Sequence, residues 1–311
     1  MADAPDPDVY VKLGAFTSKY YRDVYPAIDP TRPELSQAGK VVVITGASRG
    51  LGQLGLAPFF ARANARGIAL LGRSADGLAE TEKIVKDINP ATQVLCLPVD
   101  VTDVKRVAAA FDKIVDQLGV PNVLINNAGA LTLDTMFDSD IESWWNVQEV
   151  NVKGTFIVTK AFLSKTGATP TAPTTIINQT SISAMGVPPG LSSYSMSKLA
   201  MNKFTAWLAS EHPAITSVSL DPGIVETEIA RAVPYLGPFM KDTPELIGGA
   251  SVWLASGDKA FLSGRTVSAN WDFEELEVKK QEIVEGDLLT LCFRGSFGGS
   301  IGTSKTPTID V

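Results

Sequence analysis

Short apolar runs alternate with longer segments of helical character along most of this chain. The runs are rich in Val, Ile and Leu, which is typical of parallel strands buried on both faces. They occur at 40–45, 67–73, 93–100, 123–129, 174–181, 214–223 and 265–269. This order predicts the α/β class, with a doubly wound (Rossmann-type) seven-stranded parallel sheet and helices on both faces.

The two ends of the chain depart from this pattern. Residues 1–39 mix aromatic residues with charges and prolines, and beyond Asn270 the chain becomes acidic and then rich in Gly, Ser and Thr. We therefore predict one domain over 40–270, an N-terminal extension over 1–39 and a C-terminal extension over 271–311. The last part, 300–311, is expected to be flexible because of its composition.

Charge and composition exclude several classes of protein. The net charge of −7 argues against nucleic acid as a partner, because phosphate binding needs clustered Lys and Arg. The cysteines, Cys96 and Cys292, and the single histidine, His212, have no metal-ligand spacing, so no metal site is expected. The first residues are not those of a secretory signal, and no apolar stretch approaches the ~20 residues of a membrane span. We expect a cytoplasmic protein without a membrane span.

A glycine-rich turn follows the first predicted strand. The sequence TGASRGLG occupies positions 45–52 and opens a helical segment, which is the context that a dinucleotide-binding turn requires. Its glycines permit a tight turn and let the backbone approach a pyrophosphate at a helix N-terminus. The alternative is a strand-to-helix turn that binds nothing. The predicted cofactor-binding residues of this turn are Gly46, Ser48, Arg49, Gly50, Leu51 and Gly52.

The end of the second predicted strand indicates which dinucleotide is bound. Chains that bind NAD place Asp or Glu there to bond the ribose 2′-hydroxyl, whereas this chain has Arg73. Arg49 and Arg73 together could hold a 2′-phosphate, which predicts NADP(H) as the cofactor. The alternative is two solvated surface arginines.

Three residues carry the predicted chemistry. Tyr194 and Lys198 are four apart in a segment of helical pattern, so their side chains share one face. A neighbouring ammonium is expected to lower the pKa of the tyrosine and make it an acid/base catalyst. Ser181 follows the fifth predicted strand and can hydrogen-bond the substrate oxygen. Each residue also has a structural alternative, as a core tyrosine, a surface lysine or a helix cap.

These motifs, in this order, resemble the short-chain dehydrogenase/reductase family over roughly 40–270. Further matching motifs are Asp100-Val101, Asn126 to Gly129, Asn151, the spacing of Ser181, Tyr194 and Lys198, and Asp221 to Thr227. The resemblance implies that Asn151 completes a catalytic tetrad by anchoring a proton-relaying water, and that Lys198 bonds the nicotinamide ribose. It also implies dimers or tetramers of identical subunits. The further cofactor-binding residues that it implies are Asp100, Val101, Asn127, Ala128, Gly129, Pro222, Gly223, Val225 and Thr227.

Apolar residues dominate the segments where this family has its substrate pocket. Met185 and Val187 stand between Ser181 and Tyr194, and Tyr235 and Phe239 belong to the segment where family members have a mobile lid. We therefore expect a bulky, mostly apolar ketone, aldehyde or secondary alcohol. The two extensions resemble those of fungal-type members, many of them presumed tailoring enzymes of secondary metabolism.

Two alternative functions are consistent with the same motifs. One is a non-redox enzyme on the same fold, such as a cyclase or a dehydratase. The other is a binding protein that senses dinucleotides without turnover, although such proteins commonly lose the Tyr or the Lys that this chain retains. The leading prediction is an NADPH-dependent carbonyl reductase or alcohol dehydrogenase.

Overall fold

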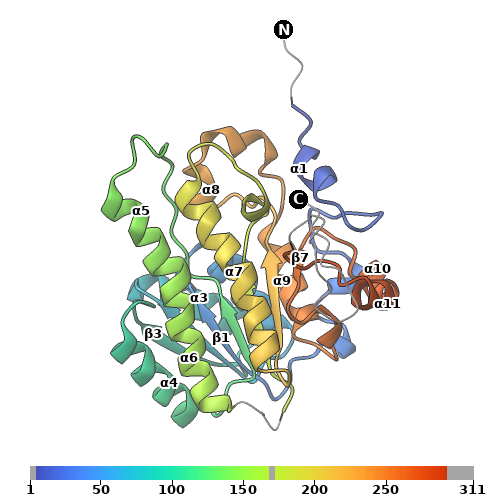
Figure 1. The fold of residues 1–311 in the computed structure, drawn as a ribbon. Helices are drawn as coiled ribbons and strands as arrows, with labels where there is room; N and C mark the ends of the chain where they lie inside the picture. The colour runs from blue at the N-terminus through green and yellow to red at the C-terminus, as the bar shows by residue number, and fades with distance from the viewer. Residues whose placement is uncertain (1–4, 168–171, 293–311) are drawn as a thin grey trace, which may run out of the picture.

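The computed structural model describes residues 5–167 and 172–292. A seven-stranded sheet forms the centre of the molecule, with the strand order β3-β2-β1-β4-β5-β6-β7 and all neighbours parallel (Figure 1). This confirms the predicted fold class. The strands are β1 (Val41–Thr45), β2 (Gly67–Gly72), β3 (Gln93–Pro98), β4 (Val123–Asn126), β5 (Thr175–Gln179), β6 (Thr216–Asp221) and β7 (Thr266–Ser268).

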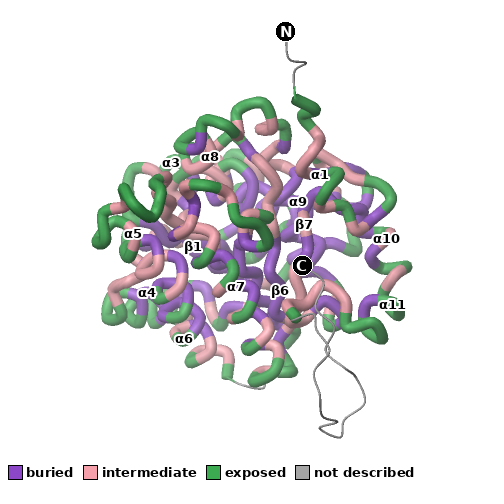
Figure 2. Tube along the Cα trace, turned by 45° about the horizontal axis from the view of Figure 1, so that its top comes forward, coloured by how far each residue is buried: buried purple, intermediate pink, exposed green. Residues whose placement is uncertain are grey.

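Successive residues of the strands point to opposite faces of the sheet, and each face packs against its own helices. One face meets α2 (Ala57–Arg62), α3 (Ala75–Ile88) and α9 (Pro244–Leu254). The other meets α4 (Val104–Leu118), α6 (Thr155–Thr166) and α7 (Ser192–Glu211). Figure 2 shows the buried strands inside and exposed turns of α3, α4 and α6 outside, whereas α9 is buried along most of its length. The remaining helical segments include α5 (Ile141–Gln148), α8 (Glu228–Arg231), α10 (Phe273–Val278) and α11 (Lys280–Glu285).

Side-chain caps fix where several of these helices begin. Ser74 accepts a hydrogen bond from the backbone N–H of Gly77 at the start of α3, and Asp103 accepts one from Arg106 at the start of α4. Such caps satisfy N–H groups that have no partner within the helix. Two stretches are π-helical, η3 (Gly52–Leu56) and η4 (Glu149–Gly154), and both lie beside the predicted site residues.

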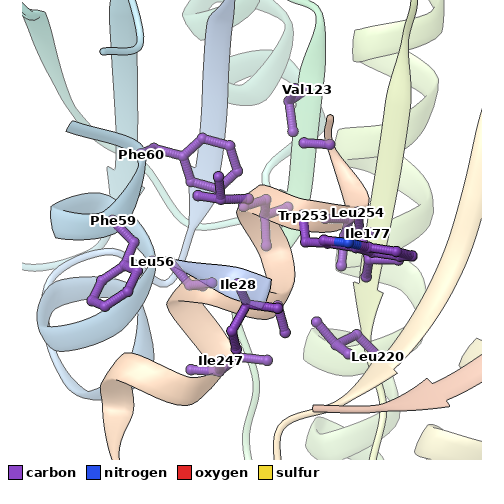
Figure 3. Close-up of a cluster of buried hydrophobic side chains, with 14 of the residues drawn as sticks. Ile28, Leu56, Phe59, Phe60, Val123, Ile177, Leu220, Ile247, Trp253 and Leu254 are labelled. Carbon is purple, nitrogen blue, oxygen red and sulfur yellow. The ribbon is translucent and has the colours of Figure 1, made fainter. Parts of the chain in front are cut away.

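The N-terminal segment 5–39, which we call the leader, packs on the body of the protein. It contains α1 (Val9–Leu13) and the short 3-10 helices η1 (Pro26–Ile28) and η2 (Pro33–Leu35). Ile28 is fully buried in the cluster of Figure 3, together with Leu56 and Ile247. The leader therefore contributes to the main hydrophobic core.

The C-terminal segment covers the edge of the sheet at β7. The Trp271 ring N–H donates to the carbonyl oxygen of Gly14 at 2.8 Å, and Tyr20 pairs with Trp271 in an antiparallel bridge. The hydroxyl of Tyr25 donates to the Trp271 carbonyl and accepts from the N–H of Phe273. The segment 300–311, predicted to be flexible, lies outside the described residues. Among the described residues, no helix combines the length and apolar character needed to cross a membrane.

Candidate active site

A large cavity opens where the strands end. The strand order reverses direction between β1 and β4, and ligands of doubly wound sheets bind beside the carboxyl ends of the strands at such a point. The cavity measures about 1660 Å³, more than the ~300–1,000 Å³ of an ordinary small-molecule pocket. Its walls come from the segments that follow β1 to β7, from the leader and from the C-terminal segment.

The glycine-rich turn after β1 forms one end of this cavity. Gly46 has φ +65°, and a Cβ there would lie 2.8 Å from the Cα of Ala128. A Cβ on Gly52 would lie 2.4 Å from the Gly46 carbonyl oxygen, so a side chain would be excluded at both positions. The amide group of Asn127 donates to the carbonyl oxygens of Thr45 and Gly46 and ties the turn to the end of β4.

The predicted cofactor-binding residues gather around this one cavity. Gly52 does not line it, because it packs against the Gly46 backbone beneath the turn. The others all contribute to the wall. They are Gly46, Ser48, Arg49, Gly50, Leu51, Arg73, Asp100, Val101, Asn127, Ala128, Gly129, Tyr194, Lys198, Pro222, Gly223, Val225 and Thr227.

The two predicted phosphate-binding arginines have acidic neighbours. Arg49 forms an ion pair with Glu228, and both side chains are more than half exposed. Arg73 is exposed near Asp100. Burial raises the pKa of Asp100, but hydrogen bonds from Thr102 and the charge of Arg73 outweigh burial and lower it. The pairing of Arg49 with Glu228 was not foreseen from the sequence, because Glu228 is 179 residues away from Arg49.

Ser181, Tyr194 and Lys198 line the same cavity. Tyr194 and Lys198 lie one turn apart on α7, and the Lys198 Nζ is 5.5 Å from the centre of the Tyr194 ring. Lys198 is buried, and its ammonium donates to the carbonyl oxygen of Gln179 at 2.8 Å. Ser181 follows β5 and caps the 3-10 helix η5 (Ile182–Met185), where its hydroxyl accepts from the N–H of Ser183.

The pKa of Tyr194 is raised, and the predicted lowering is therefore wrong for this structure. Burial is the main cause, and the negative charge of Asp221 adds to it, while the Ser181 hydroxyl acts in the opposite direction. The prediction considered only the charge of Lys198 and left out the loss of hydration around the phenol. Burial also lowers the pKa of Lys198 to about 8, against the charge of Asp221.

Asp221 is a titratable residue that the sequence analysis quoted only as part of a motif. Its carboxylate lies at the end of β6, accepts a hydrogen bond from the N–H of Ile182 at 3.1 Å, and lines the cavity. Burial raises its pKa to about 6, although hydrogen bonds from Ile182, Gly223 and Ser268 oppose the shift. A carboxyl group thus joins Tyr194 and Lys198 as a third titrating group of the site.

Asn151 is fully buried in η4 and does not line the cavity. Its side-chain oxygen accepts from the N–H of Ala130 at 2.7 Å, and its amide group donates to the Ala130 carbonyl and to the Ser197 hydroxyl. These bonds connect the segment that follows β4 to α7. The side chain of Asn151 therefore positions the elements that carry Gly129 and Lys198.

Three of the four predicted substrate residues, Met185, Val187 and Tyr235, line the cavity. Phe239 does not. It ends the 3-10 helix η6 (Pro234–Phe239), and its ring packs edge-on against Tyr10 of the leader, with 4.8 Å between the ring centres.

Two parts of the wall contain no predicted site residue. Leader residues 10, 11, 13 and 14 line the cavity, as do residues 286–290 of the C-terminal segment. The aromatic residues of the leader indicated that it packs against something, but the sequence did not indicate which part of the protein it contacts. Thr266 donates its backbone N–H to the carbonyl oxygen of Leu289, which holds the C-terminal segment against β7.

Comparisons with known proteins agree with this geometry. The family model of short chain dehydrogenases matches residues 40–234. A short chain dehydrogenase from Monascus purpureus is 38% identical over 88% of this chain and 94% of its own. One from Emericella variicolor is 32% identical over 90% of this chain and 96% of its own. The aligned 90% of this chain is longer than residues 40–311, so the similarity to the Emericella protein includes part of the leader.

A solved structure shares the fold over a shorter part of the chain. A gluconate 5-dehydrogenase from Burkholderia cenocepacia J2315, in complex with NADP and tartrate, is 25% identical with a TM-score of 0.68. It covers 78% of this chain and 96% of its own. The family that these proteins represent comprises oxidoreductases that bind a nicotinamide dinucleotide and act on small molecules. With its sheet order, glycine-rich turn and Ser-Tyr-Lys group, the chain belongs to the short-chain dehydrogenase/reductase family.

Proposed function

We propose that this protein is an NADP(H)-dependent carbonyl reductase, which in the reverse direction oxidises the corresponding secondary alcohol. The observation that carries the proposal is the shared cavity: Ser181, Tyr194 and Lys198 line the same space as the glycine-rich turn 46–51. A dinucleotide on the turn and a substrate at Tyr194 can therefore be held next to each other.

The residues around the turn fit a dinucleotide. Gly46 and Gly50 line the cavity without a side chain, so a pyrophosphate can approach the backbone of the turn there. Arg73 stands at the end of β2, where an enzyme that prefers NAD has an acid, and this supports NADP(H). When bound, the dinucleotide supplies or accepts the hydride.

Tyr194 is the proposed proton donor. Its raised pKa keeps the phenol protonated at neutral pH, as the reduction of a carbonyl requires. The phenol then protonates the substrate oxygen as negative charge develops on it, and the Ser181 hydroxyl donates a hydrogen bond to the same oxygen. The ammonium of Lys198 stabilises the phenolate that remains. Asn151 is a positioning residue, because it acts through Ala130 and Ser197.

The substrate proposed is bulky, neutral and mostly apolar. Apolar side chains dominate the part of the cavity between η5, η6 and the leader, where Met185, Val187, Tyr235 and Leu236 form much of the wall. The arginines of the described wall, Arg49 and Arg73, belong to the opposite, dinucleotide end. A carboxylate or phosphate group placed among these apolar side chains would lose its hydration, because Lys198, the lysine of the described wall, lies at Tyr194 instead.

A panel of ketones and aldehydes tests this proposal. The purified protein is mixed with NADPH and each compound, and consumption is followed at the absorbance band of the reduced nicotinamide. We expect turnover of bulky neutral carbonyl compounds and a preference for NADPH over NADH. Turnover of charged small acids or sugar phosphates alone would contradict the proposed substrate class.

A second candidate is a non-redox cyclase or dehydratase. Asp221 favours it, since a carboxyl group whose pKa is about 6 beside Tyr194 could move a proton without hydride transfer. The two candidates differ in stoichiometry, because a reductase consumes one NADPH for each product and a dehydratase consumes none. Product analysis by mass spectrometry, alongside the absorbance measurement, separates them.

We also propose that the protein is a cytoplasmic homo-oligomer with a role in fungal secondary metabolism. Phe156 on α6, Leu199 and Trp207 on α7, and Trp145 on α5 expose between 42% and 57% of their surface. Large apolar side chains exposed together on neighbouring helices favour contact with another subunit. Light scattering that gives the mass of a monomer would contradict the oligomer.

A further inference from the structure

The leader forms part of the wall of the substrate compartment. Tyr10, Val11 and Leu13 of α1 line the cavity together with Gly14, which ends this helix. A Cβ on Gly14 would lie 3.1 Å from the Cδ1 of Ile182, the residue that follows Ser181. The leader therefore reaches the immediate surroundings of the proposed catalytic serine.

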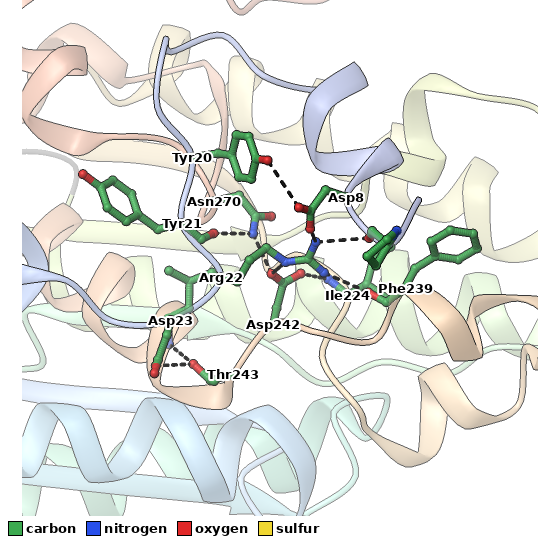
Figure 4. A network of polar contacts seen from close by, with 12 residues as sticks. Asp8, Tyr20, Tyr21, Arg22, Asp23, Ile224, Phe239, Asp242, Thr243 and Asn270 are labelled. Atoms are coloured by element: carbon green, nitrogen blue, oxygen red, sulfur yellow. Dashed lines mark hydrogen bonds and ion pairs between the residues drawn. The ribbon is translucent and has the colours of Figure 1, made fainter. Parts of the chain in front are cut away.

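Arg22 fastens the leader to the body of the protein (Figure 4). Its guanidinium donates to Asp242 at 2.6 Å, to Asp8 at 2.7 Å and to the carbonyl oxygen of Phe239 at 2.9 Å. The Asp242 side chain has no exposed surface, and the Arg22 side chain exposes 17%. Because the guanidinium has several donors in a fixed plane, it joins the start of α1, the end of η6 and the buried carboxylate at once.

Asp242 extends this connection to the proposed nicotinamide end of the cavity. It accepts a hydrogen bond from the backbone N–H of Ile224, which lies in the loop after β6, and another from the side chain of Asn270 at 2.7 Å. Asn270 in turn donates to the carbonyl oxygen of Tyr21 at 2.8 Å. The leader is thus bonded to the loop after β6 and to the segment after β7.

Aromatic packing joins the leader to the lid segment η6. The Phe239 ring contacts the Tyr10 ring edge-on. Of these two rings, that of Tyr10 belongs to the residue that lines the cavity. The lid residues Tyr235 and Leu236 line the cavity beside it. Leader and lid therefore form one continuous surface around the part of the cavity that is distant from the glycine-rich turn.

We propose that residues 8–22 of the leader form a built-in wall of the substrate compartment, that Tyr10 determines how well a bulky substrate is bound, and that Arg22 is the positioning residue of this wall. The inference rests on the proposed carbonyl reduction and names the segment that gives it selectivity for size. A small substrate that occupies only the surroundings of Ser181 and Tyr194 gains nothing from Tyr10, whereas a bulky apolar substrate does.

Variants of α1 test the wall. Tyr10→Ala removes a side chain of the wall, and Lys12→Ala is the matched control, because Lys12 lies on the same helix, is exposed and does not line the cavity. Both are assayed with NADPH and a series of ketones of increasing size. We expect Tyr10→Ala to raise the KM of the bulky ketones about tenfold, with kcat and the KM of the smallest ketone within about twofold. The same ratio of bulky to small kcat/KM in both variants would overturn the proposal.

Arg22→Lys tests the positioning role. A lysine keeps the charge but cannot bond Asp8, Asp242 and the Phe239 carbonyl in one plane. We expect the KM of bulky ketones to rise, with kcat for the smallest ketone retained, at a temperature where circular dichroism shows the variant folded. Equal losses for small and bulky ketones would overturn the positioning role of Arg22 in the wall. If Arg22→Lys does not fold, the pair Tyr10→Ala and Lys12→Ala still decides.

A binding measurement separates failure of the wall from failure of the proposed reaction. If the unaltered protein consumes no NADPH with any ketone, the reductase proposal fails, and the wall is tested with the fluorescent apolar dye Nile red. A dissociation constant at least about threefold higher for Tyr10→Ala than for Lys12→Ala supports the wall. Equal constants overturn it.

Discussion

The ammonium of Lys198 lies 5.5 Å from the centre of the Tyr194 ring and donates its hydrogen bond to the carbonyl oxygen of Gln179. The ammonium thus lies over the ring and is not bonded to the phenol oxygen. Burial dominates both groups, so the pKa of Tyr194 is raised and that of Lys198 is lowered. The pair is therefore arranged for proton donation rather than for a standing phenolate.

Replacing Tyr194 by phenylalanine tests the proton donor. Tyr194→Phe keeps the ring and removes the hydroxyl, so we expect kcat to fall at least about 100-fold. The dissociation constant of NADPH, measured by fluorescence, should stay within about twofold. Tyr21→Phe is the control, because it removes a hydroxyl from a tyrosine that does not line the cavity and should keep its kcat. Similar activity of the two variants would show that Tyr194 is not the donor.

The pH dependence of reduction should report Lys198. Its pKa is about 8, so its ammonium is lost as the pH rises through this value, and with it the stabilisation of the phenolate. The charged group that influences its pKa is Asp221, which keeps Lys198 protonated to higher pH than burial alone would. We expect kcat/KM for ketone reduction to fall above about pH 8. Lys198→Met should lose most activity, and its remaining kcat/KM should not fall above about pH 8. Lys203→Met is the control, because Lys203 lies on the exposed side of the same helix, and its kcat/KM should fall above about pH 8 as in the unaltered protein.

The ion pair between Arg49 and Glu228 predicts an unusual effect on cofactor affinity. Glu228→Gln removes the carboxylate that competes with a 2′-phosphate for Arg49, so NADPH should bind about threefold more tightly. Arg73→Ala should weaken NADPH binding about tenfold and leave NADH nearly unchanged. The control is Arg231→Ala, because Arg231 pairs with Glu226 on the surface and does not line the cavity. Parallel changes for NADPH and NADH would contradict recognition of the 2′-phosphate.

Asp221 should make folding stability depend on pH in a defined direction. Burial, helped by the charge of Asp242, raises its pKa to about 6 in the folded protein, so the unfolded chain releases this proton at lower pH than the folded one. Stability from this group is therefore lost as the pH rises from about 4 to about 6. Asp221→Asn removes that loss of stability, which is about 3 kcal/mol.

Thermal unfolding at two pH values measures this effect. The Tm of Asp221→Asn, relative to the unaltered protein, should be higher at pH 7.5 than at pH 4.5. Asp287→Asn is the control, since the Asp287 side chain is mostly exposed. An equal difference in Tm at both pH values would contradict a buried, titrating Asp221.

The sequence alone determined the sheet and the elements of chemistry that are local. The apolar runs predicted all seven strands. The signal was strongest for β1, β2, β4 and β5, which are buried along their whole length, whereas the edge strand β3 is only partly buried. The turn at 45–52 was recognisable because its glycines have local causes: a positive φ at Gly46 and Gly50, and the close approach of Gly52 to the Gly46 carbonyl oxygen within the same turn. The spacing of Tyr194 and Lys198 placed them on one face of α7, because a helix repeats every ~3.6 residues.

Only the tertiary structure decided the features that depend on distant parts of the chain. Arg22 and Asp242 are 220 residues apart, and no local pattern relates them, yet their contact makes the leader a wall of the cavity. The direction of the pKa shift of Tyr194 follows from how deeply the phenol is buried and from the position of Asp221, neither of which is encoded in spacing along α7. Phe239 was predicted to contact the substrate, but it packs on Tyr10, and this contact too joins residues that are far apart in the sequence. Local periodicity fixes which face a residue occupies, whereas burial and charge depend on what the fold brings against that face.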